Sequence, residues 1–289
     1  MKWRPALDEL TRRYLAQQIE IGGAELVVQG GPGAPGGRSG PAQEPLPRSA
    51  PPPSRPARPP DHPVRPDRPV RSDRPAKDWR ADAPPVPGPG LSIESPPMDL
   101  LSNRGPSWSS LTVLADHIAK CEKCLLCEGR TNTVPGEGHA RAKMMCVGEG
   151  PGQTEDATGR PFVGRAGELL NEILAAIGYR RDEVFIANVV KCRPPQNRKP
   201  LPDEISACLP YLEAQIELIR PQVLVALGAT AAEALLNTKR SLADLRLKVH
   251  SYRGIPLVVT YHPAALLRNP NWKKPAWDDI RIARQLVDR

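Results

Sequence analysis

The pattern of hydrophobic positions predicts alternating strands and helices over residues 108–289. Four short runs are apolar at almost every position, as strands buried on both faces are: residues 144–147, 184–190, 222–227 and 257–261. In the segments between them apolar residues recur every three or four positions: residues 166–178, 202–219 and 229–236. This alternation predicts an α/β fold, a three-layer α/β/α sandwich around a four-stranded parallel sheet.

Two further helical patterns lie upstream. Residues 109–120 carry apolar side chains on one side and predict a helix that ends at a cysteine-rich turn. Residues 5–20 predict a short amphipathic helix within residues 1–25. That helix either docks on a protein partner, or is weakly formed and packs back on the domain or has no role.

Composition sets the region between these helices apart. The chain has 36 prolines, and most of them lie between Pro32 and Pro97, in runs such as P-P-P-S-R-P-A-R-P-P. Such a stretch buries too little apolar surface to offset its conformational entropy. We therefore expect residues 26–107 to be a disordered Pro/Arg/Gly-rich linker, and residues 108–289 to be the one folded domain.

Charge favours a polyanionic partner, though mildly. Residues 108–289 contain 25 Lys and Arg against 20 Asp and Glu, so the expected domain is basic in its own right. No apolar run has the length of a signal peptide core or of a membrane span. We expect a cytoplasmic protein with no membrane contact.

A glycine-rich loop follows the first strand and reads V-G-E-G-P-G-Q-T-E-D-A-T-G-R-P-F-V-G over residues 147–164. Its glycines, Gly148 and Gly150 among them, let the backbone approach a ligand closely. A strand, a glycine-rich turn and a helix together are typical of a small-molecule or phosphate site. Because Glu149 and Glu155 would repel a pyrophosphate, the loop predicts a site for an uncharged ring.

Two polar residues stand at the ends of other predicted strands. Asn188 is either a structural amide bonded to nearby backbone or an amide that offers a donor and an acceptor to a ligand. His262 directly follows the fourth strand. The carboxyl ends of parallel strands meet at one edge of the sheet, so both residues are expected beside the glycine-rich loop.

The cysteines suggest a metal centre. Cys121 and Cys124 form a C-x-x-C pair, and Cys192 and Cys208 stand far downstream. This spacing alone leaves zinc, an iron–sulfur cluster and no metal as open alternatives. Cys146, inside the first strand, is expected to be a small buried hydrophobe.

Three motifs resemble those of the family-4 uracil-DNA glycosylases, which hold a [4Fe–4S] cluster. They are G-E-G-P-G-Q-T-E-D with G-R-P-F-V-G, N-V-V-K-C-R-P-P-Q-N-R, and Y-H-P-A-A-L-L-R-N-P. The resemblance covers residues 111–287, so residues 1–107 look like an added extension. It implies a monofunctional DNA glycosylase that flips uracil out of DNA, hydrolyses its N-glycosidic bond and leaves an abasic site in base excision repair.

The resemblance also implies roles for individual residues. The implied cluster ligands are Cys121, Cys124, Cys192 and Cys208, with Cys127 a bystander. The implied substrate-binding residues are Gly150, Glu155, Phe162, Asn188 and Asn197. Within that set Phe162 would stack on uracil, Asn188 would pair with its edge, and Glu155 would crowd the place of thymine's methyl group. His262 would stabilise charge on O2, and Glu149 would position the attacking water, with Glu155 and Asn197 as alternatives.

Further residues are expected to contact DNA: Arg193, Arg198, Lys199, Leu267 and Arg268. Leu266 and Leu267 could form a wedge that fills the vacated base stack, or could cap the core.

The sequence leaves three other functions open. The first is a relative that binds uracil-DNA covalently, but the His-bearing insert of that variant is absent between Lys191 and Cys208. The second is a glycosylase of broader specificity, against which Asn188 and Glu155 argue. The third is a non-catalytic iron–sulfur DNA-binding module.

Overall fold

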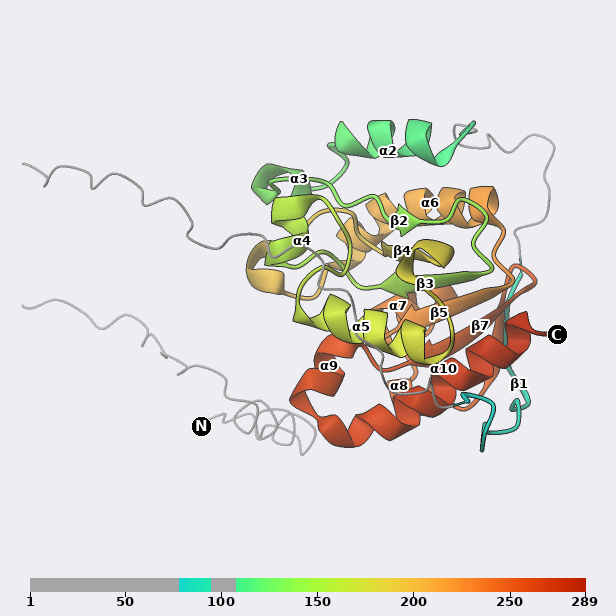
Figure 1. Cartoon of the computed structure of the whole chain (residues 1–289). Coiled ribbons are helices and arrows are strands. Elements are labelled where there is room, and N and C mark those ends of the chain that lie inside the picture. The colour runs from blue at the N-terminus through green and yellow to red at the C-terminus, as the bar shows by residue number, and fades with distance from the viewer. Residues whose placement is uncertain (1–77, 95–107) are drawn as a thin grey trace, which may run out of the picture. The chain divides into compact units, whose positions relative to one another are not determined.

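A seven-stranded sheet forms the centre of the protein. The computed structural model describes residues 78–94 and 108–289 (Figure 1). The strands lie in the order β1-β6-β7-β5-β3-β4-β2. Their bounds are β1 Pro89–Ile93, β2 Glu137–Gly138, β3 Met144–Gly148, β4 Phe185–Asn188, β5 Val223–Leu227, β6 Val249–Tyr252 and β7 Ile255–Thr260.

The four strands expected from sequence are the central ones, and they pair in parallel: β7 with β5, β5 with β3, and β3 with β4. The expected strand number of four is wrong, because three further strands extend the sheet. β2 pairs antiparallel with β4, β6 pairs antiparallel with β7, and β1 pairs parallel with β6. β2 has only two residues, and β1 and β6 are not continuously apolar, so none of them resembles a buried strand in sequence.

Helices cover both faces of the sheet, which confirms the three-layer α/β/α arrangement (Figure 1). The helices on one face are α2 Leu111–Ala119, α6 Pro202–Ile219, α7 Ala229–Leu236 and α8 Leu242–Leu245. Those on the other face are α5 Arg165–Ala176 and α10 Lys273–Val287. Shorter helices are α3 Leu126–Gly129, α4 Gln153–Thr158 and α9 Pro263–Arg268, with the 3-10 turns η1 Arg181–Glu183, η2 Pro195–Asn197 and η3 Pro270–Trp272. Among the described helices, none is long and apolar enough to cross a membrane.

Residues 78–94 pack on this domain, so the expected disordered linker over residues 26–107 is wrong for that segment. Trp79 is buried against α10, and the Gln285 amide donates to the Pro84 carbonyl oxygen at 2.9 Å. In β1, the Leu91 N–H donates to Nδ1 of His250 on β6 at 2.9 Å. The rest of the expected linker and the amphipathic helix expected within residues 1–25 lie outside the described residues.

Candidate active site

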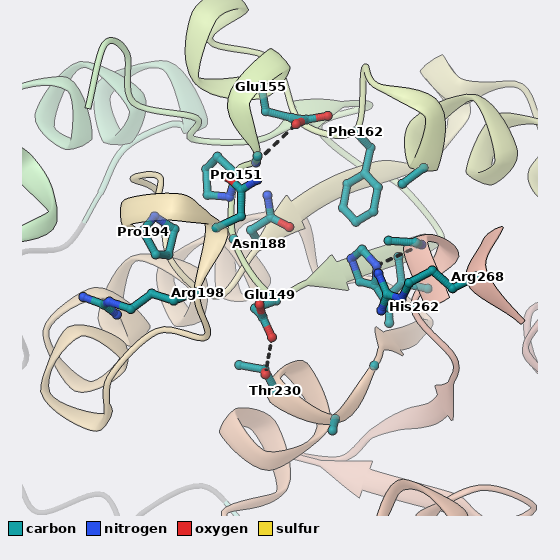
Figure 2. Close-up of a pocket in the computed structure, with 18 residues that line it drawn as sticks. Glu149, Pro151, Glu155, Phe162, Asn188, Pro194, Arg198, Thr230, His262 and Arg268 are labelled. Carbon is teal, nitrogen blue, oxygen red and sulfur yellow. Dashed lines mark hydrogen bonds between the residues drawn. The ribbon is translucent and has the colours of Figure 1, made fainter. Parts of the chain in front are cut away.

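A cavity of about 450 Å³ opens where β3, β4, β5 and β7 end (Figure 2). The structure brings most of the candidate site residues to it: Glu149, Gly150, Glu155, Phe162, Asn188, Asn197, Arg198, His262 and Arg268. The parallel strands explain this gathering, because each central strand delivers its last residue to the same edge of the sheet. The volume is in the range of a site for one small ligand.

Phe162 and Asn188 form a narrow slot above the backbone of Gly148. A Cβ atom at Gly148 would lie 2.4 Å from Asn188 Oδ1 and 2.6 Å from Phe162 Cζ. The close approach therefore requires glycine at this position. Asn188 is 1% exposed, and its Oδ1 has no hydrogen-bond partner among the described residues. A buried acceptor without a partner is costly, which argues for a ligand rather than for a structural amide.

His262 faces the same slot, with its ring centroid 5.4 Å from that of Phe162. It caps α9, where its Nδ1 accepts a hydrogen bond from the Ala264 N–H at 3.2 Å. Burial, and then the positive charge of Arg268, lower the pKa of His262 to about 4. The imidazole is therefore neutral at pH 7, and because Nδ1 is the acceptor, its proton is on Nε2.

Glu149 also lines the cavity and is held by a residue that sequence reasoning missed. Thr230, near the start of α7, donates a short hydrogen bond to Glu149 Oε2. The residues are far apart in the chain, so only the fold could reveal the contact. Gly150 has no room for a side chain, because a Cβ there would lie 2.7 Å from a methyl group of Val190. Glu149 is thus the acid that this turn can present to the cavity.

The Glu155 carboxylate is engaged with backbone rather than free in the cavity. Its Oε1 accepts hydrogen bonds from the N–H groups of Val163 and Gly164 at 2.9 and 3.0 Å, and its Oε2 accepts from Gly152 at 3.2 Å. These contacts tie the start of α4 to the turn that presents Phe162. A role in excluding a thymine methyl group stays a prediction.

The expected DNA-contacting residues differ in their surroundings. Arg198 makes a two-pronged ion pair with the buried Glu204. Lys199 pairs with Glu233 at 2.7 Å, and the Arg193 guanidinium donates to Asn197 Oδ1 at 2.8 Å. These basic side chains are therefore already engaged within the protein.

The segment after His262 is more open. Arg268 is exposed and lines the cavity, and Leu267 is 38% exposed. Leu266 is 1% exposed and packs into the protein, as a residue that caps the core does. Of the two leucines only Leu267 has the exposure that a wedge requires.

The four cysteines proposed as cluster ligands line one small cavity beneath α2 and α6: Cys121, Cys124, Cys192 and Cys208. Cys127 also lines it, whereas Cys146 is buried in β3 as expected. Among the described residues no group of three His, Cys, Asp or Glu side chains is arranged to hold a single metal ion. A [4Fe–4S] cluster instead takes one thiolate at each of four irons, which suits thiols spread around a cavity.

Two hydrogen bonds to sulfur support this fit. Arg130 Nη1 donates to Cys192 Sγ, and the Lys191 N–H donates to Cys208 Sγ, both at 3.3 Å. Burial raises the pKa of Cys208 to about 11, so a thiolate at this position requires positive partners such as iron. The donor set is therefore compatible with a cluster.

Lys191 connects this cavity to the candidate active site and was not singled out in the sequence. Its side chain is fully buried, and its Nζ donates to the Asn188 carbonyl oxygen at 2.7 Å and to Gln215 Oε1 at 2.6 Å. Since Lys191 precedes Cys192, one short stretch of chain carries both the amide of the slot and a cluster-ligand candidate.

Known proteins share this domain. The family model of the uracil DNA glycosylase superfamily matches residues 135–281. A type-4 uracil-DNA glycosylase of Sulfurisphaera tokodaii is 46% identical over 187 residues, which are 62% of this chain and 85% of that protein. A type-4 enzyme of Thermotoga maritima is 45% identical over 183 residues, 62% of this chain and 95% of that protein. A type-5 uracil-DNA glycosylase of Thermus thermophilus is 34% identical over 153 residues, 45% of this chain and 68% of that protein. These similarities, at the level of the whole domain, establish that the chain belongs to the uracil-DNA glycosylase superfamily and, within it, to the type-4 family.

Proposed function

We propose that the protein is a monofunctional uracil-DNA glycosylase, which hydrolyses the N-glycosidic bond of a flipped-out uracil and leaves an abasic site for base excision repair. Membership in the family supports the reaction class. The observation that best supports the choice of base is Asn188 Oδ1, a buried acceptor without a protein partner beside Phe162 and His262.

In this proposal the slot reads uracil by hydrogen bonding. The ring stacks on Phe162, N3–H donates to Asn188 Oδ1, and the Asn188 amide nitrogen donates to O4. Cytosine presents the reversed pattern, with an acceptor at N3 and a donor at position 4. Because the amide is buried, cytosine would leave polar atoms unpaired, and a site of this kind discriminates strongly.

His262 acts on the leaving group. As the glycosidic bond breaks, negative charge develops on O2 of uracil. The neutral imidazole, with Nδ1 occupied by the Ala264 N–H, directs Nε2–H as a donor toward that oxygen. A donor fixed before the reaction stabilises the transition state without reorganisation.

Glu149 orients the water that attacks C1′ of the deoxyribose. Thr230 fixes one carboxylate oxygen and leaves the other for the water, whose proton passes to Glu149 as the new C–O bond forms. Uracil departs as an anion and is protonated by solvent. Leu267 and Arg268 would contact the DNA around the flipped nucleotide.

We further propose that Cys121, Cys124, Cys192 and Cys208 hold a [4Fe–4S] cluster. The cluster would supply a four-point covalent link between the C-x-x-C turn, the loop at Cys192 and α6, and would take no part in bond cleavage. The hydrogen bonds that Arg130 and Lys191 donate to the sulfur atoms of Cys192 and Cys208 support this proposal.

The test is cleavage of a fluorescent oligonucleotide that carries one uracil, followed by alkali, with the cluster-loaded full chain. Strand breaks that require alkali, and that are strongly reduced in His262→Ala, are expected. The matched control is Arg180→Ala, an exposed residue outside the cavity. A brown, cluster-loaded preparation that produces no abasic site would refute the enzymatic function and favour a DNA-binding module.

We also propose three properties that concern location, oligomeric state and partners. The protein would act as a cytoplasmic monomer close to the nucleoid, and the extension would recruit a repair or replication partner. A pull-down with residues 1–77 that recovers nothing above background would count against such a partner.

A further inference from the structure

The backbone of Phe162 adopts a conformation that it could not keep alone. Its φ is +50°, in the left-handed region that bulky side chains avoid. Such a conformation persists where the surrounding structure holds it, and it occurs often at ligand sites. The question is which groups hold Phe162, because its ring forms one wall of the slot.

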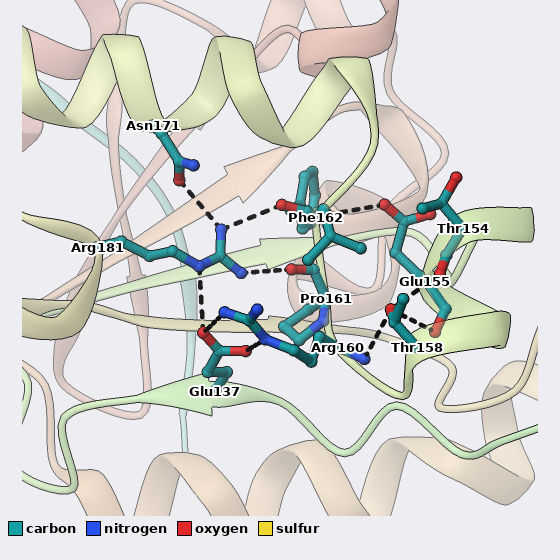
Figure 3. A network of polar contacts seen from close by, with 10 residues as sticks. Glu137, Thr154, Glu155, Thr158, Arg160, Pro161, Phe162, Asn171 and Arg181 are labelled. Atoms are coloured by element: carbon teal, nitrogen blue, oxygen red, sulfur yellow. Dashed lines mark hydrogen bonds and ion pairs between the residues drawn. The ribbon is translucent and has the colours of Figure 1, made fainter. Parts of the chain in front are cut away.

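The guanidinium of Arg181 holds the carbonyl side of this turn (Figure 3). Its Nη1 donates to the Phe162 carbonyl oxygen at 3.1 Å, and its Nη2 donates a short hydrogen bond to the Pro161 carbonyl oxygen. Arg181 thus fixes the orientation of the two peptide groups that flank the Cα of Phe162, the residue with the strained backbone. A planar fork suits this task better than an ammonium group.

Arg181 is itself fixed by neighbouring elements. Its Nη1 also donates to Asn171 Oδ1 on α5 at 3.0 Å, and its Nε pairs with Glu137 Oε1 on β2 at 3.2 Å. Arg160 pairs with the same carboxylate at 2.7 Å, and this pairing, together with Arg181, lowers the pKa of Glu137. The Arg181 side chain is only 19% exposed, so the fork is held in place on several sides.

Two further contacts hold the turn, one at its amide groups and one at the Phe162 carbonyl group. Glu155 accepts hydrogen bonds from the N–H groups of Val163 and Gly164, which follow Phe162. At Gly167, a Cβ atom would lie 1.8 Å from the Phe162 carbonyl oxygen, so the helix backbone lies directly against the turn. Carbonyl groups on one side and amide groups on the other are therefore both engaged.

We propose that Arg181 is a positioning residue, which sets the stacking face of Phe162 by holding the carbonyl groups of its turn. The inference deepens the proposed function and rests on it. Arg181 does not line the cavity, so its effect on catalysis is exerted through Phe162.

The first test compares Arg181→Gln with Arg180→Gln in the full, cluster-loaded chain. Arg180 is the adjacent residue and its side chain is 73% exposed; among the residues that the structure describes it pairs only with Asp182 and Glu183. The single-turnover rate on a uracil oligonucleotide should fall about 10²-fold in Arg181→Gln, as expected for a small displacement of a group at the reacting ring. Inhibition by free uracil should weaken in parallel, while affinity for the same oligonucleotide with thymine stays unchanged. Arg180→Gln should match the wild type in all three measurements.

The second test asks whether Arg181 acts through Phe162, using Phe162→Leu and the double variant. If it does, Arg181→Gln costs little additional rate once the aromatic ring is gone. A full, additive loss in the double variant would refute the inference, as would an unchanged rate in Arg181→Gln alone. If Arg181→Gln does not fold, Arg181→Lys serves instead, because it keeps the charge near Glu137 and loses the fork. It should lower the excision rate by a smaller factor in the same assays, and an unchanged rate in Arg181→Lys would also refute the inference. A wild-type protein that releases no uracil would instead refute the proposed function itself.

Discussion

Gly148→Ala should reduce uracil excision while leaving the protein folded. The new Cβ atom would lie 2.4 Å from Asn188 Oδ1 and 2.6 and 2.8 Å from two ring carbons of Phe162. All three distances are shorter than side chains tolerate, so the amide and the ring have to move. Both side chains border an open cavity of about 450 Å³, and the free direction for their movement is into it.

The cost therefore falls mainly on substrate binding and catalysis. Inserting one methyl group into a packed site typically costs about 1–3 kcal/mol. In the free enzyme the shifted side chains avoid most of that cost by occupying the slot, but uracil has to displace them again. At 1.36 kcal/mol for each factor of ten, kcat/KM should fall roughly 5- to 150-fold.

The assay is single-turnover excision from a uracil oligonucleotide, with thermal unfolding measured on the same preparations. The control is Gly88→Ala, because a Cβ there would meet nothing within 4 Å. We expect a reduced rate and a nearly unchanged Tm for Gly148→Ala, and no change in either for Gly88→Ala. If kcat/KM of Gly148→Ala equals that of the wild type, uracil does not occupy the space over this glycine.

Three further predictions follow from the site. Burial lowers the pKa of His262 from an ordinary 6.5 to about 4, so between these two pH values only the unfolded chain takes up the proton. The free energy of unfolding should therefore fall by up to about 3 kcal/mol as pH drops through this range, and by less in His262→Gln. An NMR titration that gives His262 a pKa near 6.5 would contradict this. Glu149→Gln should lower the single-turnover rate by about 10²- to 10⁴-fold with binding of uracil retained, and Thr230→Val should cause a smaller loss; a full rate in Glu149→Gln would transfer the positioning of water to another residue. Cys208→Ser should lose iron and brown colour, whereas Cys127→Ser should keep both, and equal iron content in the two variants would argue against the proposed ligand set.

The central sheet could be predicted from sequence because its strands are buried on both faces and are apolar throughout. Other elements could not be predicted, because they are short or carry polar residues on their buried faces. α10 was not predicted because its buried face includes Asp279 and Arg281, charged residues that interrupt the apolar pattern. Asp279 is accommodated by its pair with Arg246 at 2.7 Å, a contact that no local pattern reveals. The side chains of β6 alternate between half-buried and buried, but its sequence V-H-S-Y does not alternate in polarity, so no strand pattern stands out.

The candidate site divides in the same way. Residues at the ends of parallel strands, such as Asn188 and His262, could be expected beside the glycine-rich loop because topology alone brings them there. Thr230, Lys191 and Arg181 could not, since each acts through a partner brought close by tertiary packing. These supporting residues determine how precisely the slot is held, and only the structure identifies them.

Strand β1 has a practical consequence for how the enzyme is produced. β1 is the outer neighbour of β6 in the sheet. A chain shortened to residues 108–289 would lose this strand pairing, which runs from Pro89 opposite Val249 to Ile93 opposite Tyr252. The exposed edge of β6 would then be available to pair with another molecule, a common cause of aggregation. A shortened enzyme should therefore begin before Trp79, even though the family model starts only at residue 135.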